Sequence, residues 1–116
     1  MDDTPPVRAE LARALREAGL EVLEAGDGAE AWRVLQRGRV DLLVTDMNMP
    51  VMDGLKLIAL VRGEGAHRTT PIVVVTAEAA DEDRRRAEGL GADAYLVKPV
   101  QGQQVVEVAR RLLGLR

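Results

Sequence analysis

The sequence contains no cysteine, no long apolar run and no basic stretch, and each absence excludes a class of protein. Without cysteine, neither a disulfide framework nor a metal site built on thiolates is available. No apolar run approaches a length of about 18 residues, which a transmembrane helix needs, and no signal peptide is visible. The net charge of −3 gives no indication of direct binding to nucleic acid. Together these absences predict a cytoplasmic protein that acts neither on nucleic acid nor at a membrane.

What the chain does contain is typical of one globular domain. Its 116 residues fit a single domain, which we expect to occupy 1–116 with no output domain. Apolar residues make up 47% and charged residues 30%, both ordinary for a folded domain of this kind. The sequence shows no internal repeat, low-complexity segment or obvious linker.

Apolar bursts alternate with segments of helical periodicity along the chain. The bursts predict short strands, and two of them show little polar alternation, as expected when both faces of a sheet are covered. Strands that alternate with helices indicate a doubly wound α/β fold, a parallel sheet between two layers of helices. The predicted strands are 20–25, 40–46, 71–77 and 94–98, and the predicted helices are 4–19, 26–38, 54–62, 81–92 and 101–114.

Particular residues mark the ends of these predicted helices. Thr4 and Asp27 are suited to cap the first two helices at their amino ends. Gly19 and Gly38 follow the same two helices and are expected to stop them.

Polar residues lie where three of the predicted strands end. Asp46, Thr76 and Lys98 each end a strand, and the carboxyl ends of parallel strands meet at one edge, where ligands bind. Asp2 and Asp3 stand immediately before the first helix. Clustered carboxylates repel each other unless a cation joins them, and hard oxygen ligands favour Mg²⁺. Because a lysine and a hydroxyl beside such a metal make a receptor for phosphoryl oxygens, Asp46 is predicted to be phosphorylated.

At these residues the chain resembles the receiver domain of two-component response regulators, which has the chemotaxis-type, flavodoxin-like fold. The resemblance runs from Asp2 to the C-terminus. It rests on four motifs in order, which are DD at 2–3, DMNMPVMDG at 46–54, VVVTA at 73–77 and YLVKP at 95–99. The spacings between Asp46, Thr76 and Lys98 are similar to those of the family.

The resemblance implies which residues hold the metal ion. Asp46 would be both the phosphoacceptor and a ligand of Mg²⁺. Asp3 would be a direct ligand, and Asp2 would assist through water. The backbone carbonyl of Asn48 would complete the protein's share of the metal shell.

The resemblance also implies how the phosphoryl group is sensed. Thr76 and Lys98 would contact it, and Tyr95 would be the aromatic switch residue that swings inward on activation. The Lys98–Pro99 peptide bond is expected to be cis, as it is in the family. The implied partners are a histidine kinase or histidine phosphotransfer protein and a downstream protein target.

Three classes of function compete for these residues. The first is a stand-alone receiver that signals by protein contacts and is not an enzyme beyond its own phosphorylation and dephosphorylation. The second is a pseudo-receiver or truncated receiver, a protein-interaction module without efficient phosphorylation. The third is an aspartyl-phosphate phosphatase of the haloacid dehalogenase type. That class has a second aspartate two residues after its nucleophile, and Asn48 at this position counts against it.

Two further polar features have no part in this scheme. Arg84, Arg85 and Arg86 are consecutive, so they cannot share one helical face. They indicate a solvated helix or, alternatively, a basic patch for an acidic partner beside Tyr95. His67 lies among polar residues in a predicted loop and is given no catalytic role.

The N-terminus lacks an element that the family places directly before its acidic pair. That element is a short apolar strand inside the sheet, whereas only Met1 precedes Asp2 here. Burying four apolar side chains stabilises a fold by about 6–12 kcal/mol, against a net stability of about 5–15 kcal/mol for a whole domain. Either the natural protein begins earlier or the chain compensates. Compensation could be direct pairing of segments 21–25 and 41–45, or exchange of elements in a homodimer.

We expect an altered dimeric assembly in which Asp2 and Asp3 lie on a poorly anchored terminus, so that Mg²⁺ binds weakly or not at all. Light scattering and Mg²⁺ titration test this expectation against a variant that carries an added apolar strand. A stable monomer that binds Mg²⁺ as tightly as that variant would contradict it.

Overall fold

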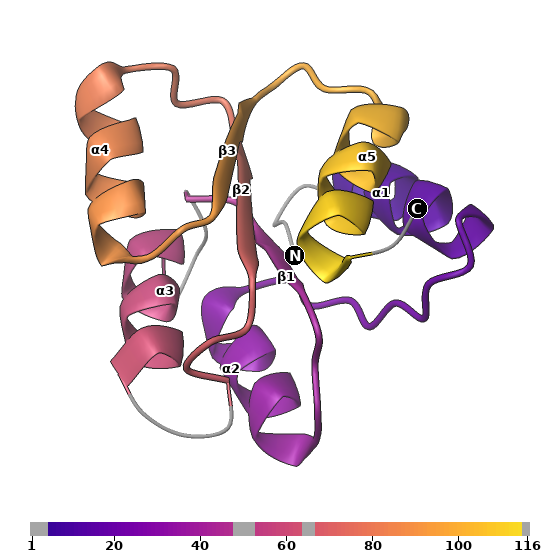
Figure 1. Ribbon diagram of the computed structural model, residues 1–116, viewed down its shortest axis with the longest axis horizontal. Coiled ribbons are helices and arrows are strands. Elements are labelled where there is room, and N and C mark those ends of the chain that lie inside the picture. Colours follow the sequence, from indigo (N-terminus) through magenta and orange to yellow (C-terminus); the bar gives the residue numbers. More distant parts are fainter. Residues whose placement is uncertain (1–4, 48–52, 64–66, 115–116) are drawn as a thin grey trace.

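The computed structural model describes residues 5–47, 53–63 and 67–114, which fold around a three-stranded parallel sheet (Figure 1). The strands are β1 (Leu43–Thr45), β2 (Ile72–Thr76) and β3 (Ala94–Val97). The helices are α1 (Pro5–Glu17), α2 (Gly28–Arg37), α3 (Gly54–Gly63), α4 (Asp81–Leu90) and α5 (Gly102–Leu113). Within these described residues, no helix is both long and apolar enough to cross a bilayer.

The central strand of the described sheet is β2, and it is buried along its whole length. It pairs in parallel with β1 on one side, where Leu43 lies opposite Ile72, and with β3 on the other. A strand that is covered on both faces has no reason to alternate polar with apolar residues. This explains the uninterrupted apolar run IVVV that begins β2.

Helices cover both faces of the sheet, as the sequence pattern predicts. α1 and α5 pack against one face, and α2, α3 and α4 lie on the other (Figure 1). Successive residues of a strand point to opposite faces, so Val73 and Val75 join the apolar cluster under α1 and α5, while Ile72 and Val74 join the opposite cluster. The predicted three-layer α/β/α arrangement is therefore confirmed.

The ends of two helices follow from the residues that the sequence marks. Asp27 caps α2, because its Oδ1 accepts the backbone N–H of Glu30 at 2.8 Å. Gly19 follows α1 with a φ of 92°, in the left-handed region that glycine adopts without strain. The predicted cap Thr4 lies outside the described residues.

The strand predicted over 20–25 is wrong, because this segment pairs with no strand in the described part of the chain. It has irregular backbone, with Leu23 73% exposed. Arg16 of α1 holds it instead, by an ion pair with Glu24 at 3.2 Å and a hydrogen bond to the Val22 carbonyl at 3.0 Å. A strand needs a neighbour for its backbone N–H and C=O groups. The direct pairing considered for segments 21–25 and 41–45 is likewise not found among the described residues.

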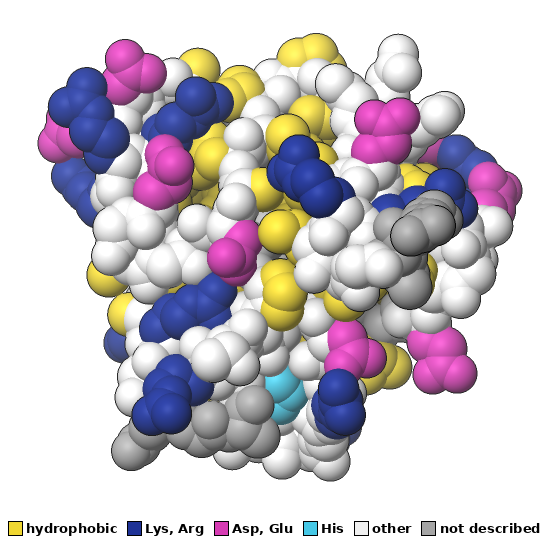
Figure 2. Space-filling model, viewed as in Figure 1, with side chains coloured by type: hydrophobic (Ala, Val, Ile, Leu, Met, Phe, Trp, Pro, Cys, Tyr) yellow, Lys and Arg dark blue, Asp and Glu magenta, His cyan; other side chains and the backbone are white. Residues whose placement is uncertain are grey.

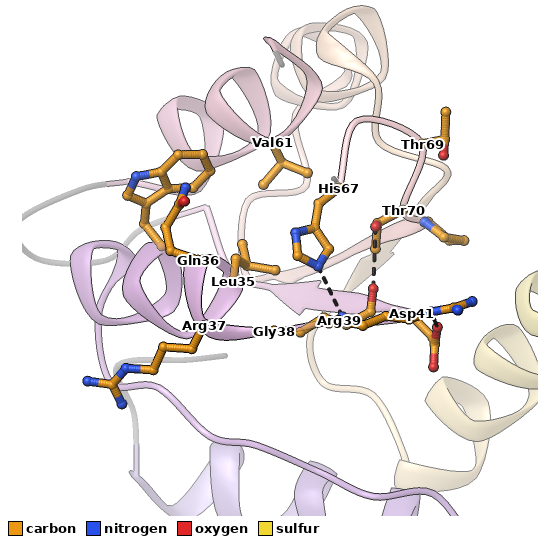
Figure 3. Close-up of a pocket in the computed structure, with 13 residues that line it drawn as sticks. Leu35, Gln36, Arg37, Gly38, Arg39, Asp41, Val61, His67, Thr69 and Thr70 are labelled. Carbon is orange, nitrogen blue, oxygen red and sulfur yellow. Dashed lines mark hydrogen bonds and ion pairs between the residues drawn. The ribbon is translucent and has the colours of Figure 1, made fainter. Parts of the chain in front are cut away.

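At the amino ends of the strands, His67 is buried, although the sequence places it in a polar loop. Its Nε2 accepts the backbone N–H of Val40 at 3.0 Å, and Thr70 Oγ1 donates to the Val40 carbonyl at 3.4 Å. These residues line a cleft of about 650 Å³ together with Trp32 and Leu35 of α2 (Figure 3). An imidazole nitrogen that accepts an N–H carries no proton, so His67 serves as a structural acceptor that joins the segments before β1 and β2.

Replacing His67 by leucine should lower the free energy of unfolding by about 1–3 kcal/mol, because the N–H of Val40 loses its acceptor in a partly buried place. His67→Gln keeps an acceptor of similar reach and should retain most of the stability. Urea denaturation, followed through the fluorescence of Trp32, the single tryptophan, compares both variants with the wild type. Equal losses in the two variants would contradict a stabilising role for the hydrogen bond.

Candidate functional site

Three residues predicted to form the site lie together at the carboxyl edge of the sheet. Asp46 directly follows β1, Thr76 is the last residue of β2 and Lys98 directly follows β3. The parallel register brings these strand ends to the same level. The backbone N–H of Lys98 donates to the carbonyl of Thr76 at 2.7 Å, which fixes two of them side by side. The Lys98–Pro99 peptide bond is cis, so that prediction is confirmed.

Asp46 and Lys98 make the central contact of this edge. Asp46 Oδ2 accepts a hydrogen bond from Lys98 Nζ at 2.8 Å, and Oδ1 accepts the backbone N–H of Met47 at 2.6 Å. The side chain of Asp46 is only 7% exposed, and that of Lys98 19%. Donors such as these favour the charged form of a carboxylate that has little contact with water. The site therefore presents a buried carboxylate with a cation already beside it.

The backbone of Asp46 is fixed by a close approach of α3. The N–H of Gly54 donates to the Met47 carbonyl at 2.9 Å, and a Cβ added to Gly54 would lie 2.1 Å from the carbonyl oxygen of Asp46. That distance leaves room for glycine alone. Asp53 caps the same helix, because its Oδ1 accepts the N–H of Lys56 at 2.8 Å. The Asp-Gly pair of the motif at 46–54 thus begins α3 and supports the backbone beneath the carboxylate.

Hydrogen bonds connect Thr76 to Tyr95 through the peptide groups of Glu78. The N–H of Glu78 donates to Thr76 Oγ1 at 3.3 Å. The carbonyl of Glu78 accepts the Tyr95 hydroxyl at 2.7 Å, and the Met47 sulfur lies 3.2 Å from the same hydroxyl. Thr76 and Tyr95 were predicted from the sequence. Glu78 was not, because it contributes backbone atoms, which no side-chain motif reveals.

Tyr95 is partly buried, and its surroundings oppose the loss of its hydroxyl proton. Burial raises the pKa of the Tyr95 phenol above its ordinary value, and the acidic groups of Asp83 and Glu78 raise this pKa further, while Arg84 acts in the opposite direction. The guanidinium of Arg84 lies over the ring, 5.3 Å from its centroid. The hydroxyl is therefore available as the donor to Glu78.

The other predicted metal ligands, Asp2, Asp3 and Asn48, lie outside the described residues, so their roles stay predictions. Across 5–47, 53–63 and 67–114, no group of three or more acidic, histidine or cysteine side chains is placed to hold a metal ion. Asp46 is the predicted ligand that the structure describes, and its carboxylate oxygens are of the hard type that Mg²⁺ prefers. The carboxylate oxygens of Asp46 are therefore suitable ligands for Mg²⁺.

Comparison with known sequences relates the chain to signalling proteins. A family model described as response regulator receiver domain matches residues 1–110. The transcriptional regulatory protein PrrA of Mycobacterium tuberculosis is 40% identical over 116 residues, which are 100% of this chain and 49% of that protein. The gliding motility regulatory protein of Myxococcus xanthus is 38% identical over 109 residues, which are 94% of this chain and 14% of that protein. The chain thus spans about half of PrrA and a smaller part of the second relative.

Solved structures share the fold across nearly their whole length. Vibrio cholerae chemotaxis protein CheY4 matches with a TM-score of 0.90 and 34% identity, covering 96% of this chain and 92% of that one. The receiver domain of the Pseudomonas aeruginosa sensor histidine kinase PA1611 matches with a TM-score of 0.89 and 30% identity, covering 98% of this chain and 93% of that one. The PA1611 structure is described with a magnesium ion coordinated in its active site cleft.

Lys98→Met should lower the free energy of unfolding by about 1–3 kcal/mol, because Asp46 loses a charge-assisted hydrogen bond where water has little access. Lys56→Met changes the other lysine of the chain, which is exposed, and is the matched control. In an Asp46→Asn background, Lys98→Met should cost much less, because no buried negative charge is left. Urea denaturation of the four proteins of this double-mutant cycle gives the interaction free energy. A value near zero would show that the pair contributes nothing.

Proposed function

The chain belongs to the response regulator receiver family, and we propose that it accepts a phosphoryl group on Asp46 from the phosphohistidine of a histidine kinase or histidine phosphotransfer protein. The observation that carries the proposal is the buried Asp46 carboxylate with the Lys98 ammonium 2.8 Å away. The pair lies at the edge where parallel sheets bind their ligands. That position favours a chemical role for Asp46 over a purely structural one.

In the proposed reaction, a carboxylate oxygen of Asp46 attacks the phosphorus atom in line with the phosphorus–nitrogen bond of the partner. That bond breaks, its electron pair stays on the imidazole nitrogen, and an acyl phosphate forms on Asp46. Lys98, which already contacts the carboxylate, would stabilise the negative charge on the phosphoryl oxygens. The chain modifies its own side chain in this reaction, so we propose that it is not an enzyme with a separate substrate.

Mg²⁺ would be held by Asp46 together with Asp2, Asp3 and the backbone carbonyl of Asn48. The oxygen chemistry of Asp46 supports this assignment, as does the magnesium ion described for the PA1611 receiver domain. When bound, the ion would supply positive charge against the phosphoryl oxygens.

The response to phosphorylation would begin at Thr76. Its hydroxyl, which now accepts the N–H of Glu78, would turn to a phosphoryl oxygen and release that peptide. The loop would be drawn inward and Tyr95 would move inward with it, because its hydroxyl is bonded to the Glu78 carbonyl, and the surface formed by α4, β3 and α5 would change. We infer that a downstream protein in the cytoplasm reads this surface by direct contact.

Acetyl phosphate with Mg²⁺ should add one phosphoryl group to the wild-type chain and none to Asp46→Asn, because an amide is not a nucleophile toward phosphorus. Intact-mass spectrometry measures the product. Asp41→Asn is the matched control, since this aspartate is exposed and lies at the amino end of β1, and it should be modified like the wild type.

Two results would contradict the proposal. A folded wild-type chain that stays unmodified would be a pseudo-receiver. Repeated hydrolysis of a phosphomonoester would instead favour a phosphatase.

A further inference from the structure

Charged side chains gather over α4, the helix beside β3 (Figure 2). Little apolar surface holds this helix to the sheet, because Ala87 is its one buried residue. Consecutive helical residues point about 100° apart, so the arginines at 84–86 face three directions. As their spacing in the sequence predicts, they do not share one face, and the structure gives Arg84 and Arg86 different contacts.

Arg84 is the member of this group that contacts the predicted switch residue. Its guanidinium lies over the ring of Tyr95, 5.3 Å from the centroid. Arg86 instead pairs with Glu82 one turn earlier, at 3.2 Å. Tyr95 is thus held at two points, at its hydroxyl by the Glu78 carbonyl and at its ring face by Arg84.

We propose that Arg84 is a positioning residue for Tyr95, which holds the ring in the orientation that bonds Glu78 and so couples α4 to the loop after β2. The consequence for signalling rests on the proposed function, since phosphorylation would act through Thr76 and Tyr95. The contact itself does not depend on phosphorylation.

The contact between Arg84 and the Tyr95 ring is weak enough to let the ring change its orientation. A cation within about 6 Å of the centroid of a tyrosine ring is attracted by the negative face of the ring. At an exposed position such as Arg84, this attraction favours one ring orientation over another by about two- to fivefold. Such a factor biases the orientation of Tyr95 without locking it.

The contact also gives α4 a part in the response. Glu78 links Thr76 to Tyr95, because its N–H donates to Thr76 Oγ1 and its carbonyl accepts the Tyr95 hydroxyl. Because coupling between sites is reciprocal, an event that moves Thr76 and the Glu78 peptides would also change the hold of Arg84 on the ring. Loss of Arg84 would in turn loosen the loop after β2, which Thr76 contacts through the N–H of Glu78.

A titration of Tyr95 tests the contact directly, because this is the single tyrosine of the chain and its phenolate absorbance is followed alone. Arg84→Gln should raise the pKa of Tyr95 further, since the cation that opposes burial and the acidic neighbours is lost. Arg85→Gln removes the same charge one residue away and should leave this pKa close to that of the wild type. Arg84→Lys keeps a cation and should restore most of the wild-type value. Circular dichroism at each pH confirms that the variants stay folded.

Two outcomes of the titration would overturn the proposal. One is an equal change of the Tyr95 pKa in Arg84→Gln and Arg85→Gln, which would reflect overall charge alone. The other is no change in either variant, which would show that Arg84 does not rest on the ring in solution.

Nuclear magnetic resonance of ¹³C-labelled tyrosine extends the test to the response. Acetyl phosphate with Mg²⁺ should modify Arg84→Gln as fully as the wild type, because Arg84 lies outside the reacting groups. Before phosphorylation, the Tyr95 ring signals of Arg84→Gln should differ from those of the unmodified wild type, because fewer rings hold the orientation that bonds Glu78. Signals that coincide with those of the unmodified wild type would overturn the proposal. If neither protein is phosphorylated, the proposed function fails, while the titration still decides the role of Arg84.

Discussion

A carboxylate with almost no contact with water depends on the groups that surround it, and at Asp46 that dependence organises one edge of the protein. Its charge is met by an ammonium group from the end of β3 and by the N–H of the next residue. This requires β1 and β3 to end at the same level on either side of β2. It also depends on α3 starting so close to the backbone that position 54 has no room for a side chain. The parallel register, the covered central strand and the glycine at the start of α3 are therefore parts of one arrangement.

The sequence predicted those parts of the fold that local pattern determines. The apolar run of β2 has no polar alternation because both of its faces are covered. Its last residue, Thr76, lies at the site because the carboxyl ends of parallel strands meet at one edge. Asp27 caps its helix through a neighbour three residues away, so the local sequence contains both partners. The segment 20–25 has the apolar residues of a strand, but a strand also needs a partner that its own sequence does not contain. Among the described residues it lies against side chains of α1 instead.

Contacts between residues distant in the sequence account for what prediction missed. His67 and Val40 are 27 residues apart, and nothing near His67 indicates that a backbone N–H needs an acceptor there. The hydroxyl of Tyr95 reaches a carbonyl 17 residues earlier, and the direction of Arg84 follows from the packing of α4 against β3. By contrast, the Asp46–Lys98 pair spans 52 residues and was still predicted. Both residues end strands of a parallel sheet, and the topology of such a sheet brings strand ends together.

The place of His67 has a consequence for how phosphoryl groups move between proteins. It is the single histidine of this chain, and its Nε2 is engaged with the backbone at the edge of the sheet opposite Asp46. The chain as given therefore has no exposed imidazole that could carry phosphate. In a mixture with a phosphohistidine partner, a phosphoramidate signal would therefore belong to the partner, whereas the proposed phosphorylation of Asp46 would give an acyl phosphate signal. The different stabilities of these two bonds toward acid and base then tell donor from acceptor without separating the proteins.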